Sequence, residues 1–113
     1  MTNFKFEGRY GTYYNCNFEV GRYSNGNIGI TIFSNDVGPV TTVTVNPGYT
    51  INDDCIAIKN YSENTGMVDW LISKDLIESN PVMITRSGFV EIPVHKLTEK
   101  GMSEFIAREE TEA

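Results

Sequence analysis

Short runs of alternating apolar and polar residues dominate the first half of the chain. In residues 12–22 every second side chain is apolar, which is the period of a half-buried β-strand, and its predicted inward face consists of Tyr14, Cys16, Phe18 and Val20. The apolar run 28–33 follows an Asn-Gly pair typical of a tight hairpin turn, and residues 40–45 form a third run of β-branched residues. These runs predict a three-stranded antiparallel meander.

The second half predicts a short strand, a helix, two closing strands and a C-terminal helix. Residues 55–58 are a short apolar run. Beyond the candidate caps Ser62, Asn64 and Thr65, a stripe at three- and four-residue spacing predicts a helix over residues 66–73, reaching as far as Lys74; it contains Met67, Val68, Leu71 and Ile72. Residues 82–84 and 89–94 read as strands joined by residues 85–88. Residues 98–112 have helical composition, with a small apolar face of Met102, Phe105 and Ile106.

These elements predict the α+β class, with an antiparallel β-meander sheet, one central helix packed on a face and a short C-terminal helix. The 113 residues are expected to form a single domain. Its core should span about residues 12–97, followed by an acidic helix or tail over residues 98–113.

Charge and cysteine content narrow the classes of partner. Fifteen acidic against nine basic residues leave a net charge of −6, which disfavours direct binding of free nucleic acid and favours basic proteins. There are two cysteines, Cys16 and Cys55, which we expect to be reduced and partly buried. Residues 1–5 lack the apolar segment of a secretion signal, and no apolar run reaches the length of a membrane span. We therefore expect a cytoplasmic protein that contacts no membrane.

Candidate catalytic and metal-binding chemistry is sparse. The single histidine, His95, follows Pro93 and Val94, and we expect it to lie at the surface or to cap a strand end. It has no neighbouring ligands at the compact spacing that zinc sites use, and no nucleophile signature accompanies it. The glycines lie among β-formers and do not precede a helix as phosphate-binding loops do. The sequence therefore predicts no enzyme, no cofactor and no metal.

Two motifs carry a resemblance to a known group of proteins. The segments YSENTGM, residues 61–67, and SGFVEIPV, residues 87–94, resemble a family of small proteins of unknown function found on phages, plasmids and conjugative elements, mainly of Firmicutes and other gut bacteria. Asn60 departs from the acidic residue usual in that family. The resemblance covers about residues 13–97 and implies no catalytic residues. Small acidic proteins of such elements resemble inhibitors of host defence, of the anti-CRISPR or anti-restriction type.

The resemblance implies a non-enzymatic binding module that blocks a nucleic-acid-handling host complex, such as a Cas nuclease, sterically and electrostatically. The carboxylates expected to contact that partner lie on the solvent face of the helix and in the tail: Glu63, Asp69, Asp75, Glu78, Glu104, Glu109, Glu110 and Glu112. Many solvated helices carry the same pattern, so plain solvation is the more common explanation of these carboxylates. An alternative is a nucleic-acid-binding accessory protein that stacks bases on an aromatic sheet face, formed by Tyr10, Tyr13, Tyr23, Arg9 and Arg22. A homodimer is a further alternative, since an open sheet edge can pair with another copy.

Overall fold

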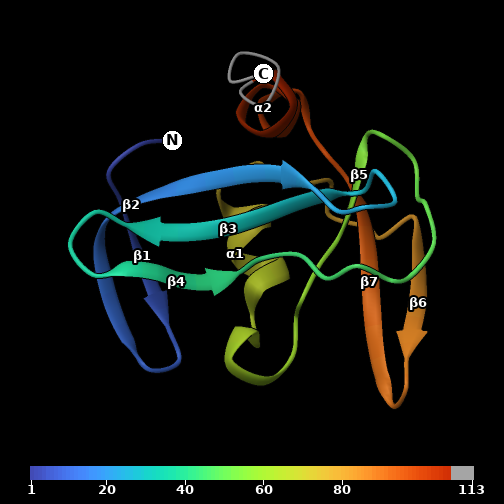
Figure 1. The fold of residues 1–113 in the computed structure, drawn as a ribbon, viewed down its shortest axis with the longest axis horizontal. Helices are drawn as coiled ribbons and strands as arrows, with labels where there is room; N and C mark the ends of the chain where they lie inside the picture. The colour runs from blue at the N-terminus through green and yellow to red at the C-terminus, as the bar shows by residue number, and fades with distance from the viewer. Residues whose placement is uncertain (108–113) are drawn as a thin grey trace.

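The computed structural model describes residues 1–107, and within them the chain forms two antiparallel sheets with short helical segments (Figure 1). The first sheet has the order β1-β2-β3-β4 and the second the order β5-β7-β6. The strands of the first sheet are β1 (Phe4–Gly8), β2 (Gly11–Arg22), β3 (Ile28–Ser34) and β4 (Gly38–Thr42). Those of the second sheet are β5 (Cys55–Ala57), β6 (Met83–Ser87) and β7 (Val90–Lys96). The helical segments are η1 (Ser62–Asn64), α1 (Met67–Ser73), α2 (Glu99–Met102) and η2 (Ser103–Ala107). This is the predicted α+β class with its meander.

The meander has one strand more than expected, because β1 pairs with β2 at its edge. Its sequence, FKFEG, does alternate, and Phe6 is buried while Lys5 and Glu7 are exposed. The pairing contains a bulge: Phe4 lies opposite Cys16 and Phe6 opposite Tyr13, so two residues of β2 face one residue of β1.

This bulge changes which side chains of β2 face inward. Asn15, at its centre, has a φ of 55°, in the left-handed region. Past it the alternation changes phase, so Tyr14 is 59% exposed and Tyr13 packs against the core instead. The predicted inward position of Tyr14 is therefore wrong. Cys16 and Phe18 are buried as expected, and Val20 is half-buried.

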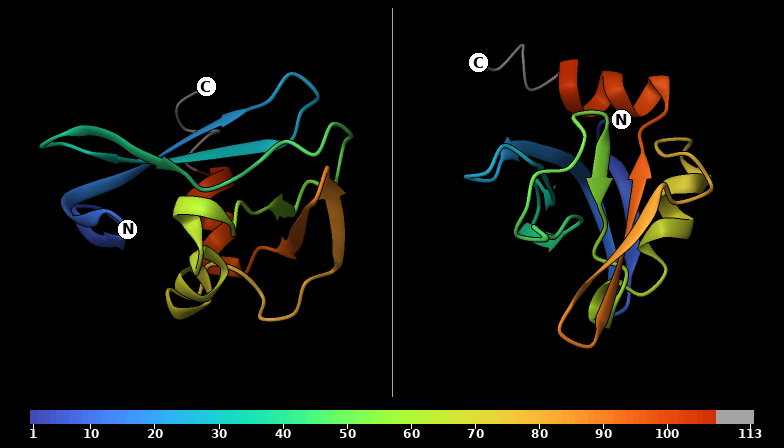
Figure 2. Two further views of the ribbon diagram at one scale, coloured as in Figure 1. Left: turned by 90° about the horizontal axis from the view of Figure 1, so that it is seen from below. Right: turned by 90° about the vertical axis from the view of Figure 1, so that its right-hand side faces the viewer.

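The predicted third strand, residues 40–45, is divided between the two sheets. β4 ends at Thr42, and the next residues cross to the second sheet. The amide of Val43 still donates to the carbonyl of Ile30 at 2.8 Å, whereas the amide of Val45 donates to the carbonyl of Ala57 at 3.0 Å. Two sheets joined by this crossing segment therefore replace the single sheet that the sequence predicts (Figures 1 and 2).

Helix α1 lies where it was predicted, but its start uses different residues from the expected caps. Gly66 is the N-cap, with a φ of 94° and no side-chain cap bond. The Oδ1 atom of Asn60 accepts the amide of Val68 at 3.0 Å, so a residue before the turn satisfies the helix start. Asn64 is buried and accepts from the Thr41 hydroxyl at 2.6 Å, while its own amide donates to the carbonyl of Thr42 at 2.6 Å. Asn64 therefore fastens η1 to β4 rather than capping α1.

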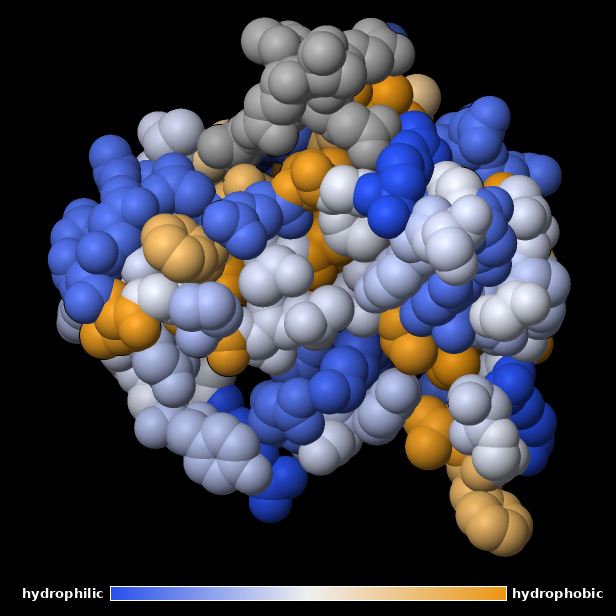
Figure 3. Space-filling model, viewed as in Figure 1, coloured by the Kyte–Doolittle hydropathy of each residue, from blue (hydrophilic) through white to orange (hydrophobic). Residues whose placement is uncertain are grey.

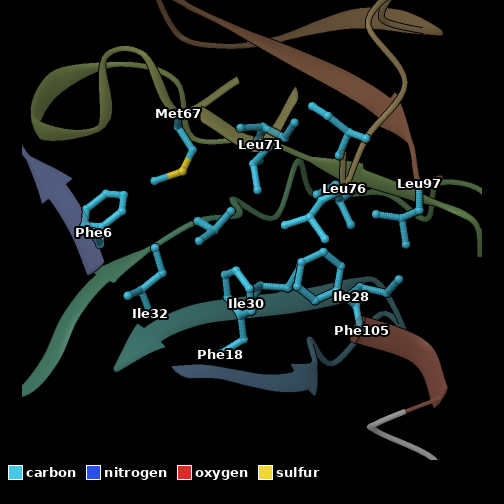
Figure 4. Packing of buried hydrophobic residues seen from close by; sticks show 14 of the residues in the cluster. Phe6, Phe18, Ile28, Ile30, Ile32, Met67, Leu71, Leu76, Leu97 and Phe105 are labelled. Atoms are coloured by element: carbon cyan, nitrogen blue, oxygen red, sulfur yellow. The ribbon is translucent and has the colours of Figure 1, made fainter. Parts of the chain in front are cut away.

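The main core lies between the meander and a layer formed by α1 and the start of the second sheet (Figures 2 and 4). Figure 4 shows Ile30 and Ile32 of β3 facing Met67 and Leu71 of α1. A smaller apolar cluster lies on the other face of the second sheet and consists of Cys55, Ala57, Ile92 and Val94. Because successive side chains of a strand point to opposite faces, β5 contributes to both clusters.

The core extends beyond residues 12–97 at both ends of the chain. Phe6 is buried near the N-terminus, and Phe105 is fully buried with its ring 5.0 Å from that of Phe18. Helix α2 starts after Thr98, whose hydroxyl accepts the amide of Gly101 at 3.0 Å, and continues as the π-helical turn η2. The apolar face predicted for this segment therefore docks on the meander.

The hairpin of β6 and β7 turns later than predicted. The last cross-strand pair is Ser87 with Val90, so the loop contains only Gly88 and Phe89, whereas residues 85–87 belong to β6. Gly88 has a φ of 61° and Phe89 does not have a positive φ. Glycine with a positive φ at the first central position is the pattern of a type II′ turn, whose twist suits a hairpin. Phe89 is therefore at the tip of the hairpin instead of at the start of a strand.

Candidate partner-binding surfaces

The structure divides the eight predicted carboxylates into three groups. Glu63 and Glu104 are engaged within the chain, by Lys59 and by the N-terminal amine of Met1 respectively. Asp69, Asp75 and Glu78 are exposed and form no ion pair within residues 1–107. The remaining three, Glu109, Glu110 and Glu112, lie outside the described residues.

The charge of Glu63 is compensated by an ion pair within the chain. Its Oε1 lies 2.6 Å from Nζ of Lys59, and this bond is the main reason why the pKa of Glu63 falls from 4.5 to about 2. The Lys59 ammonium also lies 5.8 Å from the centre of the Tyr61 ring. Glu63 therefore stays ionised at neutral pH, but the Lys59 ammonium compensates its charge and the pair joins Lys59 to the η1 turn before α1.

Asp69, Asp75 and Glu78 lie along one stretch of chain that runs from α1 to the second sheet. Asp69 is on the solvent side of α1, since Met67 and Leu71 occupy its buried side. Asp75 follows the helix with a φ of 58°. The amide of Glu78 donates to the carbonyl of Lys96 at 2.8 Å and its carbonyl accepts from the ring of His95, so its backbone is anchored to β7 while its carboxylate stays exposed. We call Asp69, Asp75 and Glu78 the acidic segment.

The aromatic and basic residues of the alternative site do not come together. Arg9 and Tyr10 form the turn before β2, whereas Arg22 and Tyr23 lie at its far end. A strand rises about 3.3 Å per residue, so the twelve residues of β2 separate the two groups by on the order of 30 Å. Tyr13 lies near the first group and packs on the core.

Within each group the aromatic ring has its own contacts. The Arg9 guanidinium lies 5.9 Å from the centre of the Tyr10 ring, and Tyr10 is 77% exposed. The hydroxyl of Tyr23 bonds to Oγ1 of Thr44 at 3.1 Å, and its ring covers Gly29, where an added Cβ would lie 3.3 Å from it. The structure therefore contains no continuous platform of these residues on which successive bases could stack.

A cleft of about 270 Å³ separates the β1–β2 turn from the start of α1. Its lining combines apolar side chains with charges of both signs, in particular Phe6, Trp70, Glu7, Arg9 and Glu63. Glu7 and Glu63 are each paired with a lysine, Lys5 at 3.2 Å and Lys59 at 2.6 Å. With both carboxylates paired, the charge of Arg9 is the one that remains, so the cleft does not gather several charges of one sign for an ionic ligand.

Four exposed apolar side chains lie on the β6–β7 hairpin and the residue before it, a surface that sequence reasoning missed. Val82, Met83 and Ile84 are 55%, 42% and 55% exposed, and Phe89 at the hairpin tip is entirely exposed. Figure 3 shows this tip projecting as an apolar end at the lower right of the molecule. Concentrations of exposed apolar side chains of this kind mark contact sites more often than isolated ones do. Gly88 is the sequence feature that could have indicated this surface, since a glycine at this position favours a turn that includes Phe89.

The side chains best suited to catalysis are inaccessible. His95 is 2% exposed, so its predicted surface position is wrong, and its Nδ1–H donates to the carbonyl of Glu78 at 2.8 Å. Cys16 and Cys55 form no disulfide and are buried, which agrees with the prediction of reduced thiols. Burial, followed by the neighbouring Asp54, raises the pKa of Cys55 to about 11.

Within residues 1–107 no group of three His, Cys, Asp or Glu side chains is arranged to hold a metal ion. No helix in the same residues is long and apolar enough to span a bilayer. Comparison of this chain with protein families, with curated proteins and with solved structures finds no match.

Proposed function

We propose that this chain is a non-enzymatic protein-binding module that blocks a basic, nucleic-acid-handling complex of a bacterial host, such as a Cas nuclease or a restriction enzyme. The acidic segment carries the proposal: Asp69, Asp75 and Glu78 are exposed and unpaired within residues 1–107, whereas Glu63 and Glu104 are neutralised internally. Exposed carboxylates without an internal counter-charge can occupy a basic channel and exclude its nucleic acid.

Three further observations support this function over the alternatives. The net charge of −6 draws basic partners and repels free nucleic acid. The separation of Tyr10 from Tyr23 removes the shared platform that the nucleic-acid-binding alternative requires. The burial of His95 and of both thiols keeps these groups away from any substrate, which favours binding over catalysis.

Charge reversal on the acidic segment tests the proposal. The tagged chain is used to capture partners from host lysate at low and at high salt, and any nuclease that it retains is assayed for cleavage. We expect one nucleic-acid-handling complex to be captured at low salt and released at high salt, because exposed charges are screened. Its cleavage should be inhibited by the wild-type chain and not by the variant Asp69→Lys/Glu78→Lys.

A matched control separates the position of the charge from its amount. The variant Glu19→Lys/Asp53→Lys makes the same change in net charge at two other exposed acids and should inhibit as the wild type does. Equal inhibition by both double variants would contradict a role of the acidic segment. Recovery of nucleic acid without a stoichiometric protein would replace the proposal with the nucleic-acid-binding alternative. An empty bait at both salt concentrations would refute tight inhibition in that host.

A further inference from the structure

We infer that the free edge of β6 pairs with β6 of a second copy of this chain, antiparallel and around a two-fold axis at Thr85. β6 is the outer strand of the second sheet, and its five residues form no backbone hydrogen bond on the side away from β7 within residues 1–107 (Figure 2). The inference concerns the hairpin and does not depend on the function proposed for the acidic segment.

β6 has few of the features that usually protect an exposed sheet edge, although the Tyr49 hydroxyl donates to Oγ1 of its half-buried Thr85 at 2.5 Å. The edge strand β4 contains Pro39 and has a register shift against β3, and the edge strand β1 is interrupted by its bulge against β2. β6 contains no proline, no lysine and no bulge. Its one charge, on Arg86, lies 3.5 Å from the Glu91 carboxylate of the same hairpin, so the edge is close to neutral. Two copies of a chain of net charge −6 can therefore approach here without bringing like charges together.

Pro93 reveals which backbone groups of β6 point outward. The carbonyl of Pro93 accepts the amide of Ile58 at 3.0 Å, so the backbone of Pro93 faces β5. Ile84 of β6 is the cross-strand partner of Pro93 on the side of β7 away from β5. Because the backbone of Pro93 faces β5, Ile84 and Pro93 form a non-hydrogen-bonded pair. The amide and carbonyl of Ile84 must then point away from β7, and by the same alternation those of Arg86 do too.

Only one symmetric register uses all of these outward groups. With Thr85 opposite Thr85 of the second copy, Ile84 lies opposite Arg86, and these two residues exchange both of their backbone hydrogen bonds on each side of the axis. A shift that centres the pair on Arg86 would place two arginines opposite each other. A shift that centres it on Ile84 would place Arg86 opposite Val82, whose amide already donates to the carbonyl of Val94 at 2.8 Å.

The same register places the exposed apolar side chains against the second copy. Phe89 of each hairpin tip then lies opposite Pro81 of the other, next to Val82, and Ile84 covers the aliphatic part of Arg86. Phe89 alone presents roughly 200 Å², and with Val82, Met83 and Ile84 the exposed side chains amount to on the order of 450 Å² per copy. If the second copy covered all of this surface, the two copies together would bury at most about 900 Å², below the ~1,200–2,000 Å² of a stable complex. The dimer should therefore form at high concentration and dissociate on dilution.

Sedimentation velocity over a range of concentrations, combined with two substitutions of one residue, tests this pairing. Arg86→Pro removes the outward amide and leaves the β7 side untouched, which edge strands tolerate. Arg86→Ala removes the same side chain and keeps the amide. We expect the wild type and Arg86→Ala to dimerise as concentration rises and Arg86→Pro to stay monomeric with an unchanged far-ultraviolet circular dichroism spectrum.

A cysteine in place of Thr85 reports the register directly. Thr85→Cys should form an interchain disulfide on mild oxidation, whereas Ser87→Cys, which faces Met83 of the second copy, should not. Phe89→Ser provides a second dimer-weakening variant should Arg86→Pro fail to fold, since its side chain has no contact to lose within one copy. A wild-type chain that stays monomeric at millimolar concentration would overturn the inference. Dimerisation that Arg86→Pro or Phe89→Ser leaves unchanged, or efficient cross-linking by Ser87→Cys alone, would do the same.

Discussion

The substitution Gly101→Ala sets helix propensity against tertiary packing at one residue of α2. Glycine in a helix is about 1 kcal/mol less favourable than alanine, so the local expectation is that Gly101→Ala stabilises the fold. The structure predicts the opposite. A Cβ on Gly101 would overlap the carbonyl oxygen of Leu76 and lie 3.1 Å from its carbonyl carbon and 3.3 Å from Cβ of Leu97. The overlapped atoms belong to the backbone, and the Leu76 carbonyl also accepts the amide of Thr98 at 3.2 Å. Moving this carbonyl away from the new Cβ would therefore strain or break that hydrogen bond.

The loss of unfolding free energy can be estimated from the displacement of α2 that the added Cβ requires. Overpacking a filled site costs about 1–3 kcal/mol, and displacing α2 far enough to relieve the overlap would also loosen Phe105, whose full loss is worth about 3–5 kcal/mol. After the propensity gain is subtracted, we expect Gly101→Ala to lower the free energy of unfolding by roughly 1–4 kcal/mol. At about 4 °C for each kcal/mol in a domain of this size, Tm should fall by roughly 5–15 °C.

Urea unfolding followed by circular dichroism, together with a thermal melt, measures this effect. The control is Ser103→Ala, which introduces the same residue at an exposed helical position two residues later and should stay within about 0.5 kcal/mol of the wild type. A Gly101→Ala chain as stable as the wild type, or more stable, would refute the close approach of α2 to Leu76.

Three further predictions concern the core, the pH dependence of stability and the thiols. Phe105→Ala should lower the free energy of unfolding by about 3–5 kcal/mol in urea, because the ring is fully buried; a loss below about 1 kcal/mol would show that the C-terminal segment does not dock. The pKa of Glu63 is lowered from 4.5 to about 2 by Lys59, so its contribution is complete above pH 4.5 and is lost as the pH falls toward 2. In urea unfolding at several pH values, Glu63→Gln should therefore be less stable than the wild type at pH 7, and the difference should vanish toward pH 2; a difference that does not depend on pH would contradict the pairing. Burial raises the pKa of Cys55 to about 11 and also raises that of Cys16, so a disulfide reagent at pH 8 should modify both thiols slowly until denaturant is added; complete reaction of the native protein on mixing would contradict their burial.

Much of the fold could be predicted from local pattern. The alternation in residues 12–22 and 28–33, the Met67–Leu71 stripe and the β-formers of residues 55–58 correspond to β2, β3, α1 and β5. The pattern was also present in β1, where Phe4 and Phe6 alternate with Lys5 and Glu7, but the segment is short. Periodicity succeeds here because each element has one face in the core, and burial of apolar area selects for that face.

The candidate surfaces were much harder to predict, because they depend on which residues meet. The sequence placed Glu63 among the available carboxylates, yet its bond to Lys59 neutralises it. Tyr10 and Tyr23 looked like parts of one face, yet a strand of twelve residues separates them. The apolar run 89–94 predicts Phe89 as the first residue of a strand, although the turn at Gly88 places it at the exposed tip of the hairpin.

What the sequence by itself determined is the α+β class and most of the elements in their order, β1 being the strand that it missed, since these follow from propensity, periodicity and turn residues acting over a few positions. The tertiary structure alone decided that residues 43–45 cross between two sheets, that the bulge at Asn15 turns Tyr14 outward, and that His95 is buried. It also decided that Gly101 is required by the approach of Leu76. Each of these depends on a partner many residues away, and a local pattern contains no information on which distant backbone or side chain will fill the space beside it.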